Sequence, residues 1–266
     1  MVVFYHMTEN EVKNYANFHL SIELNSTEIH FLLVDKSTKK AVAIESLSLD
    51  EKKINKSFLQ ESEILTKSSP DSVSCVIQNS LLALVPNSMF QEGESQTYLG
   101  FNSNSLESIE TKSDKLIKHE ITSCYGLDKE TQILFSSVFP SIQFKHISSI
   151  LVDSLSDGFH INFSAKNEFE ITVIENKKLL FFNRFIAENT DETLYYVSLV
   201  AEKLKLNIQR VNLNLSGMIS PKDETFLFFS QFIPSENLNF NEIEASQLNA
   251  ISTHRFFTLH KQIQCV

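Results

Sequence analysis

The 266-residue sequence has no tryptophan and only five glycines, five prolines and three cysteines. Glycine usually makes up about 7% of a protein, and it lets a backbone turn approach a bound phosphate closely. Its scarcity therefore weighs against phosphate-binding loops. Cys75, Cys124 and Cys265 are far apart in the sequence and form no Cys-x-x-Cys pair. This pattern favours reduced, structural cysteines of a cytoplasmic protein over catalytic ones.

A basic surface and a membrane-spanning segment are also missing from the sequence. The formal net charge is −10, whereas proteins that bind nucleic acid usually carry a basic face, so we expect no nucleic-acid partner. The longest apolar runs, such as residues 81–85, are far shorter than the ~20 residues of a membrane-spanning helix. Residues 1–6 also lack the basic start of a signal peptide. The sequence therefore predicts a cytoplasmic protein without membrane insertion.

The most informative feature that is present is a pair of alternating polar and apolar runs, and it occurs twice. Residues 18–24 and 28–35 flank a short polar turn, and their period of two predicts a half-buried β-hairpin. Residues 159–163 and 168–175 repeat the pattern, and the second copy opens with the same Phe-His pair as the first. We interpret this recurrence as an internal duplication.

The elements after each hairpin are also predicted in the same order: a third strand, a helix, a strand and a helix. The first copy alone contains extra residues, about 79–125, which we interpret as an insertion. In the first copy we expect a helix over 50–67, a hairpin over 73–85 and, over 87–101, a helix interrupted near Gly93. The predicted parts of the chain are a lead-in, a first lobe and a second lobe: residues 1–16, 17–156 and 157–266.

Three antiparallel strands followed by helix, strand and helix, twice in one chain, is the element order of actin-like ATPase folds. Five motifs make the likeness more specific: Phe18-His19-Leu20-Ser21-Ile22, Leu84-Val85-Pro86-x-x-Met89-Phe90, Tyr98-Leu99-x-Phe101-Asn102, Phe139-Pro140 with His146 after it, and Leu213-x-Leu215-Ser216-Gly217. By these motifs the chain, from about residue 17 on, resembles an uncharacterised family of Bacteroidetes catalogued as domain of unknown function 3822. Relatives of that family with known structure resemble the actin-like ATPase fold.

This resemblance implies the fold class and says less about activity. It implies an α/β protein with a duplicated actin-like ATPase (ribonuclease H-like) fold of two lobes. A small α+β insertion is expected in the first lobe. Because the motifs consist of packing residues rather than reactive ones, they support the fold more than any chemistry.

Working actin-like ATPases hold phosphates with two strand–turn–strand loops built on Asp-x-Gly, and this chain departs from that pattern at both turns. The first turn, residues 22–27, reads Ile-Glu-Leu-Asn-Ser-Thr, and the second, residues 162–167, reads Asn-Phe-Ser-Ala-Lys-Asn. Neither contains the glycine that lets backbone N–H groups approach a phosphate. Glu23 could replace the first carboxylate, whereas Ser164 stands where the second would be. ATP hydrolysis is therefore disfavoured, and we expect no catalytic residues and no cofactor.

An alternative hypothesis keeps a nucleotide, ATP with Mg²⁺, bound by side chains in place of glycine backbone. The candidate contacts come from the first turn and from a strand-to-helix turn where ligands collect in α/β sheets: Glu23, Asn25, Ser26, Ser216 and Gly217. A strand-to-helix turn needs a small residue without any ligand, so a structural role is favoured for Gly217.

The sequence contains no recognisable catalytic or metal-binding constellation. Its eight histidines form no ligand set, and His19 and His160 occupy equivalent strand positions, which duplication explains better than metal binding. No Gly-x-Ser-x-Gly, His-Glu-x-x-His or Walker-type loop is present. We therefore favour a scaffold or interaction subunit without hydrolase activity.

A protein partner is expected on the insertion. Apolar side chains occupy an expected helix surface there, beside a polar loop: Met89, Phe90, Tyr98 and Phe101. Aromatic anchors of this kind suit a modest protein interface. The alternative, that these side chains hold the insertion onto its own lobe, stays open at this point.

Overall fold

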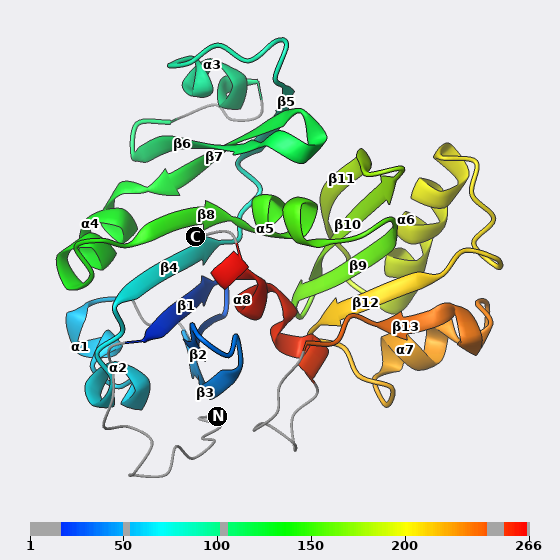
Figure 1. Cartoon of the computed structure of the whole chain (residues 1–266). Helices are drawn as coiled ribbons and strands as arrows, with labels where there is room; N and C mark the ends of the chain where they lie inside the picture. Colours follow the sequence, from blue (N-terminus) through cyan, green and yellow to red (C-terminus); the bar gives the residue numbers. More distant parts are fainter. Residues whose placement is uncertain (1–16, 50–53, 102–105, 244–252, 265–266) are drawn as a thin grey trace. The chain divides into compact units, whose positions relative to one another are not determined.

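The computed structural model describes residues 17–49, 54–101, 106–243 and 253–264, and the chain divides into two compact units (Figure 1). Of the described residues, 17–153 and 258–264 belong to the first unit, and 154–243 and 253–257 belong to the second. The predicted second lobe runs to residue 266, whereas residues 258–264 group with the first unit, because they hydrogen-bond to its strands.

The first unit is built on a five-stranded sheet in the order β3-β2-β1-β4-β8. Its strands are β1 Phe18–Leu24, β2 Glu28–Asp35, β3 Ala41–Ser48, β4 Ser72–Ile77 and β8 Gln143–His146. The first three are antiparallel, which confirms the predicted first hairpin, and β4 and β8 run parallel to β1. One sheet face buries Leu20, Ile22 and Phe31 in a core with the helices α1 Lys56–Leu59, α2 Glu63–Lys67 and α4 Lys129–Val138.

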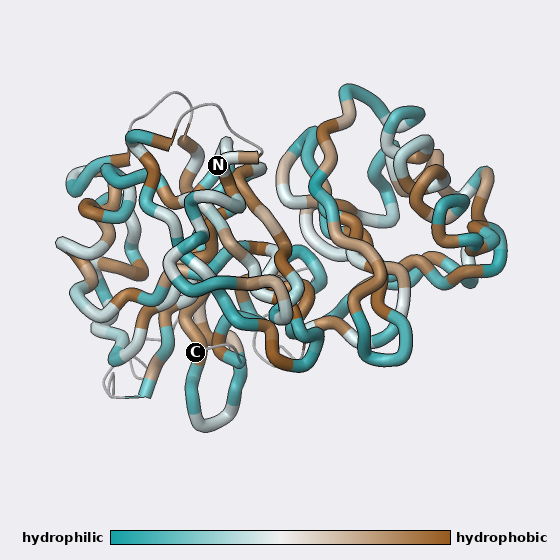
Figure 2. Tube along the Cα trace, turned by 90° about the horizontal axis from the view of Figure 1, so that it is seen from above, coloured by the Kyte–Doolittle hydropathy of each residue, from teal (hydrophilic) through white to brown (hydrophobic). Residues whose placement is uncertain are grey.

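The second unit repeats this plan. Its strands are β9 Gly158–Ala165, β10 Glu168–Glu175, β11 Lys178–Ile186, β12 Leu213–Gly217 and β13 Leu238–Phe240, in the order β11-β10-β9-β12-β13. Helices α6 Thr190–Lys203 and α7 Glu224–Phe229 pack on its apolar face. Figure 2 shows apolar stretches within each unit and polar residues at many of the turns. The matching strand order and strand directions support the predicted duplication, which stays a prediction.

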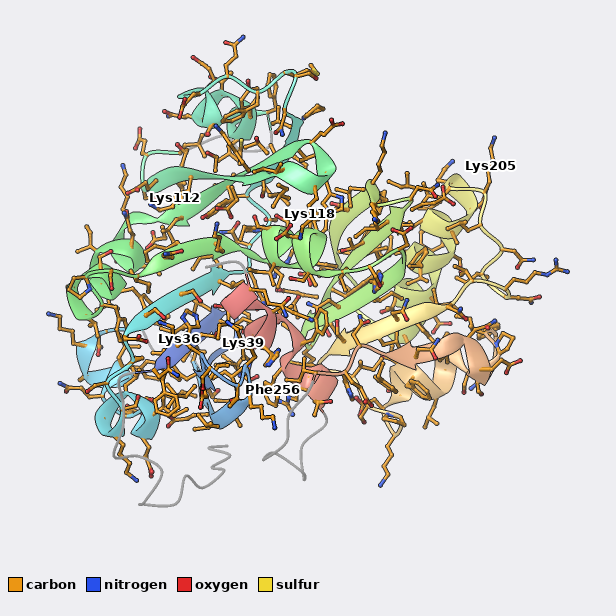
Figure 3. The ribbon with its side chains drawn as sticks, viewed as in Figure 1. Lys36, Lys39, Lys112, Lys118, Lys205 and Phe256 are labelled. Carbon is orange, nitrogen blue, oxygen red and sulfur yellow. The ribbon has the colours of Figure 1, made fainter. Side chains whose placement is uncertain are left out.

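The chain between β4 and β8 forms a small α+β insertion with its own three-stranded sheet, in the order β5-β7-β6. It comprises β5 Leu82–Pro86, α3 Ser95–Gly100, β6 Ile109–Leu116 and β7 Ile121–Asp128. Lys118, which follows β6, forms an ion pair with Asp153 of α5 (Ile147–Ser154) at 3.1 Å (Figure 3). This contact attaches the insertion to a helix of its own unit.

Three predicted elements of the first copy differ from the structure. Residues 73–85 are no hairpin, because β4 pairs with β1 and β8 while β5 pairs with β7 in another sheet. The helix expected over 50–67 is divided into α1 and α2, because Asn55 and Ser62 each cap a new helix; its first residues, 50–53, lie outside the described part. Of the interrupted helix expected over 87–101, only the part after Gly93 forms, as α3; the φ of +90° at Gly93 agrees with the expected interruption.

The last described residues form short helical turns. A 3-10 turn, Thr253–Phe256, leads into α8, Phe257–Lys261, and a second 3-10 turn, Gln262–Gln264, follows. None of the helices in the described ranges is long and apolar enough to cross a membrane.

Candidate functional site

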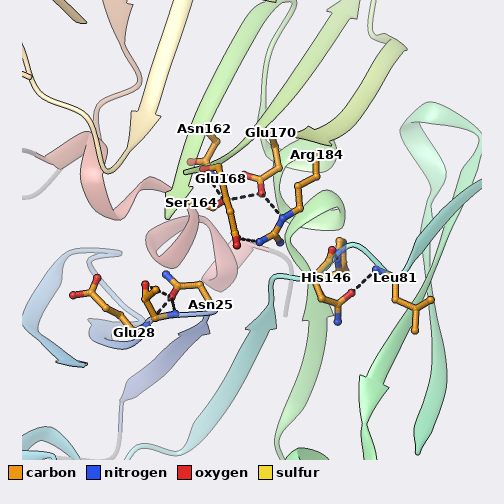
Figure 4. Close-up of polar contacts among 11 residues, drawn as sticks. Asn25, Glu28, Leu81, His146, Asn162, Ser164, Glu168, Glu170 and Arg184 are labelled. Carbon is orange, nitrogen blue, oxygen red and sulfur yellow. Dashed lines mark hydrogen bonds and ion pairs between the residues drawn. The ribbon is translucent and has the colours of Figure 1, made fainter. Parts of the chain in front are cut away.

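The β1–β2 turn, at the position of the first phosphate loop, is held by its own side chain. Asn25 is buried, and its side-chain oxygen accepts hydrogen bonds from the backbone N–H groups of Thr27 at 2.9 Å and Glu28 at 2.7 Å (Figure 4). Such an Asx turn supplies from the side chain the acceptor that keeps a turn tight. Ser26 lies exposed at the tip. The turn therefore forms without glycine, and the Asn25 oxygen is engaged by the protein's own backbone.

Glu23 is covered by residues 258–264, which we call the closing segment. The Glu23 carboxylate is 6% exposed and accepts a hydrogen bond from the Thr258 hydroxyl group. Beside it, the Gln262 amide donates to the Ile22 carbonyl oxygen at 3.0 Å and accepts from the Ser74 hydroxyl group at 2.7 Å. In Figure 1, α8 lies next to β1. Glu23, which could replace the first phosphate-loop carboxylate by its place in the sequence, is thus hydrogen-bonded within the fold.

The contacts of the closing segment were not foreseen from the sequence, although a signal was present. Thr258, His260 and Gln262 are polar residues of a short segment that also contains Phe257, Leu259 and Ile263. All three are buried, and each has a hydrogen bond to the first unit. Polar residues that recur within a buried apolar segment indicate that they are hydrogen-bonded, but not to which partner.

The two equivalent histidines are both buried and hydrogen-bonded. His19 lies between the Ser72 and Ser74 hydroxyl groups, at 2.9 and 2.8 Å from its two ring nitrogens. Burial lowers the pKa of His19 to about 4, so its ring is neutral at pH 7. Burial also lowers the pKa of His160, whose Nε2 lies 2.9 Å from the Ser156 carbonyl oxygen. In the described ranges no group of three His, Cys, Asp or Glu side chains could hold a metal ion.

The second hairpin carries a buried polar network on the sheet face opposite α6 and α7 (Figure 4). Both oxygens of the Glu170 carboxylate are hydrogen-bonded, one to the Asn162 amide at 2.9 Å and the other to the Ser164 hydroxyl group at 2.8 Å. Arg184 pairs with Glu168, and its Nε lies 3.9 Å from Glu170. Burial raises the pKa of Glu170, and the Arg184 charge opposes that rise. Ser164, at the position of the second phosphate-loop carboxylate, thus serves to bind Glu170.

The other two candidate residues, Ser216 and Gly217, join the same hairpin. The Ser216 hydroxyl group donates to the Asn162 side-chain oxygen at 2.9 Å. Gly217 has a φ of +83°, and a Cβ atom added there would lie 2.2 Å from the Phe163 carbonyl oxygen. Met218 donates its backbone N–H to that same oxygen at 2.7 Å. This close approach of β12 to β9 explains why a glycine stands at position 217, and no ligand is needed to explain it.

A pocket of about 260 Å³ lies beside the β9–β10 turn in the second unit. Its charged lining consists of Lys166 and three carboxylates, those of Glu168, Glu188 and Glu224. Ligand pockets usually measure about 300–1,000 Å³, so this one is small. An excess of carboxylates also disfavours a polyphosphate, because like charges repel in a partly enclosed site.

The two sheets, each with three antiparallel strands followed by two parallel ones, define the class: this is a protein of actin-like ATPase fold. The chain belongs to the family described as "Protein of unknown function (DUF3822)", whose model matches residues 7–235. It is similar in structure to a Bacteroides thetaiotaomicron protein with actin-like ATPase fold and unknown function. The TM-score is 0.77 at 19% identity, over 98% of this chain and 100% of that chain.

Two further solved structures share the fold. One is the cytoplasmic domain of EpsL, an inner membrane component of the type II secretion system of Vibrio cholerae, with a TM-score of 0.51 at 14% identity over 93% of this chain and 94% of that one. The other is from a PilM–PilN type IV pilus biogenesis complex, with a TM-score of 0.57 at 10% identity over 95% and 98%. No curated protein matches the sequence. At these identities the likeness shows the fold alone.

Proposed function

We propose that the protein is an interaction subunit that binds another protein through its insertion and does not hydrolyse ATP. The observation that carries this proposal is the closing segment on β1. A phosphate-loop carboxylate has to be free to orient a metal ion or an attacking water. Glu23 is instead buried and bound to Thr258. Freeing it would cost the hydrogen bond from Thr258.

The assembly role of the two fold neighbours supports a protein partner. The EpsL domain belongs to a secretion system and PilM belongs to a pilus biogenesis complex, so the same fold works there as one component of an assembly. We extend that role to this chain as part of the proposal. The insertion is the natural place for a partner, because it has no counterpart in the repeated plan of the two sheets.

The side chains on the insertion divide into two pairs with different roles. Phe90 and Tyr98 are half-buried with ring centroids 6.0 Å apart, and the Tyr98 hydroxyl group donates to the Met89 carbonyl oxygen at 3.0 Å. These two rings pack against the small buried core of the insertion, which consists of Val85, Leu99 and Cys124. Met89 and Phe101 are 68% and 82% exposed. The proposed partner therefore contacts Met89 and Phe101, with the aromatic pair as support.

Affinity capture with matched variants tests this function. Met89→Asp and Phe101→Asp should each reduce at least one specifically captured protein by about fivefold or more, since interface anchors often contribute more than 1 kcal/mol. Ile133→Asp is the control, because Ile133 is 68% exposed on α4, outside the insertion. Melting temperatures of all three should match the unsubstituted protein. Identical captured proteins for all variants would contradict the proposal.

The pocket beside the β9–β10 turn favours a second candidate, a nucleotide-binding protein. Its position next to the second phosphate turn supports this role, and its three carboxylates oppose it. A ligand that binds only the native state raises the melting temperature. Under the second candidate, Mg-ATP would raise it and Lys166→Ala would remove the rise. Under our proposal, Mg-ATP leaves the melting temperatures of the unsubstituted protein and of Lys166→Ala unchanged.

A further inference from the structure

The strand β11 leaves an open edge on the sheet of the second unit. It is nine residues long, lies at one end of the strand order, and pairs only with β10 among the described strands (Figure 1). An open edge presents unpaired backbone N–H and C=O groups that bind another strand readily, so proteins usually block it. Leu180 and Ile186 on this strand are 46% and 65% exposed. Exposed apolar residues on a long edge strand make pairing with another chain more favourable.

The corresponding edge strand of the first sheet, β3, is attached to a helix by a buried carboxylate. The β3 residue Glu45 is buried, and its carboxylate accepts hydrogen bonds from the Ser62 hydroxyl group at 2.6 Å and from the Ile64 backbone N–H at 3.1 Å. These contacts fasten the start of α2 to β3. In the described part of the second unit, β11 has no such carboxylate and packs on α6 through the Phe185 and Tyr196 rings, 4.9 Å apart. The two edge strands therefore differ in how they are attached, and β11 is the one on which Leu180 and Ile186 are exposed.

The hydrogen-bond pattern shows which backbone groups of β11 point away from β10. Ala187 donates its N–H to the Asn167 carbonyl oxygen at 2.9 Å, next to the Ile186–Glu168 pair. In an antiparallel ladder, hydrogen-bonded and non-hydrogen-bonded pairs alternate. Phe182, Arg184 and Ile186 therefore direct their N–H and C=O groups outward.

We propose that β11 pairs antiparallel with β11 of a second copy of this chain, about a two-fold axis at Asn183. In this register Phe182 lies opposite Arg184 of the second copy and Arg184 opposite Phe182. The outward groups of both residues then meet in hydrogen-bonded pairs. Because the interface uses the same strand twice, it closes after two copies and yields a dimer with one continuous ten-strand sheet from two five-stranded ones.

Side-chain chemistry selects this register over its neighbour. An axis at Asn183 places exposed Leu180 opposite exposed Ile186, and Lys178 opposite Glu188, so apolar meets apolar and opposite charges meet. An axis at Phe182, the neighbouring register that also pairs the outward groups, would instead place Leu180 opposite Arg184 and Lys178 opposite Ile186, so charged residues would meet apolar ones. The pairing of β11 with β10 shifts register at Leu180: Phe181 pairs with Val173 and Leu179 pairs with Ile174, so no residue of β10 pairs with Leu180.

The dimer is independent of the partner proposed for the insertion. The strand β11 belongs to the second unit and the insertion to the first, so variants of one leave the residues of the other unchanged. Loss of the dimer and loss of the insertion's partner are therefore distinguishable results.

Sedimentation of the full chain up to about 100 μM tests the proposal, with two double variants. Leu180→Lys with Ile186→Lys places like charges opposite each other twice, and we expect the dimer dissociation constant to rise at least about tenfold. Leu180→Glu with Ile186→Lys places opposite charges there, so the dimer should persist. Tyr195→Lys, 60% exposed on α6, is the control and should leave the dimer unchanged.

Three results would overturn the proposal. A monomer at every concentration would exclude the dimer. Open-ended association beyond two copies would exclude the two-fold axis, because that interface closes. Dissociation of both double variants would exclude the register at Asn183.

Discussion

At the scale of single residues, Gly217 occupies a backbone position that other residues reach only with strain. Its φ is +83°, and a Cβ atom would overlap the Phe163 carbonyl oxygen. We expect Gly217→Ala to lower the free energy of unfolding by at least about 2 kcal/mol, measured by urea denaturation. Gly100→Ala is the control, since no atom lies within 4 Å of its added Cβ. Equal effects of the two substitutions would contradict this account of Gly217.

His19 makes the stability of the first unit sensitive to acid. Burial, with a smaller contribution from the Lys36 charge, lowers its folded-state pKa from 6.5 to about 4. The unfolded chain therefore binds a proton at higher pH than the folded one. The stability linked to His19 is present above pH 6.5 and is lost as the pH falls to about 4. We expect His19→Gln to lose less stability over that range, and an unchanged pH profile would contradict the assignment.

The sequence identified some of these residues but not their partners. Glu23 could be selected because it stands at a recognisable turn, and a structural role was favoured for Gly217. The pairing of Arg184 with Glu168 and its approach to Glu170 could not be predicted. It depends on the register of β11 against β10, and a shift of one residue would move Arg184 to the other face.

At the scale of elements, the closing segment holds β1 and β4 through Gln262. We expect Gln262→Ala to lower the free energy of unfolding by about 1–3 kcal/mol, because it leaves the buried Ile22 carbonyl oxygen and the Ser74 hydroxyl group without this partner. Gln264→Ala, at an exposed position two residues later, should have little effect. Urea denaturation of both variants measures the difference. A similar loss for both would indicate that the segment acts through general packing instead.

Local sequence patterns predicted the elements that are determined by residues close together in the sequence. The two hairpins follow from alternation over residues 18–35 and 159–175, and α6 is the helix predicted after the third strand of the second copy. The hairpin expected over 73–85 was wrong, because β4 pairs with β1, which lies about fifty residues earlier. A polar turn at Asn79-Ser80 indicates that the chain changes direction, but not which sheet receives the next strand.

At the scale of the whole molecule, we expect Mg-ATP turnover to stay at background. Neither candidate turn has the glycine of a phosphate loop, and Glu23 is bound within the fold. Phosphate release by the purified protein, with and without Mg²⁺, measures this. The matched variant is Glu23→Gln. Magnesium-dependent release that this substitution abolishes would contradict the prediction, since a contaminating ATPase would not respond to it.

The fold could be predicted as a whole because two kinds of signal agreed. The repeated hairpin indicated two similar sheets, and the short packing motifs resembled one family. The similarity to a solved structure confirms the actin-like fold, and the match of the family model confirms the family. The lobe boundaries at residues 156 and 157, and the origin of the lobes by duplication, stay a proposal that the matching strand orders support. Function could not be predicted to the same degree, because packing motifs specify a scaffold and not its ligand.

The closing segment also constrains when the protein can mature during synthesis. Gln262 and its acceptor Ile22 are 240 residues apart in the sequence, so the ribosome translates all of the second unit between them. Until the closing segment has been translated, its hydrogen bonds to Glu23, Ser74 and the Ile22 carbonyl oxygen cannot form. Contacts of such long sequence separation form slowly, and nascent chains that await them are prone to aggregate. The first unit to be translated is thus the last to be completed.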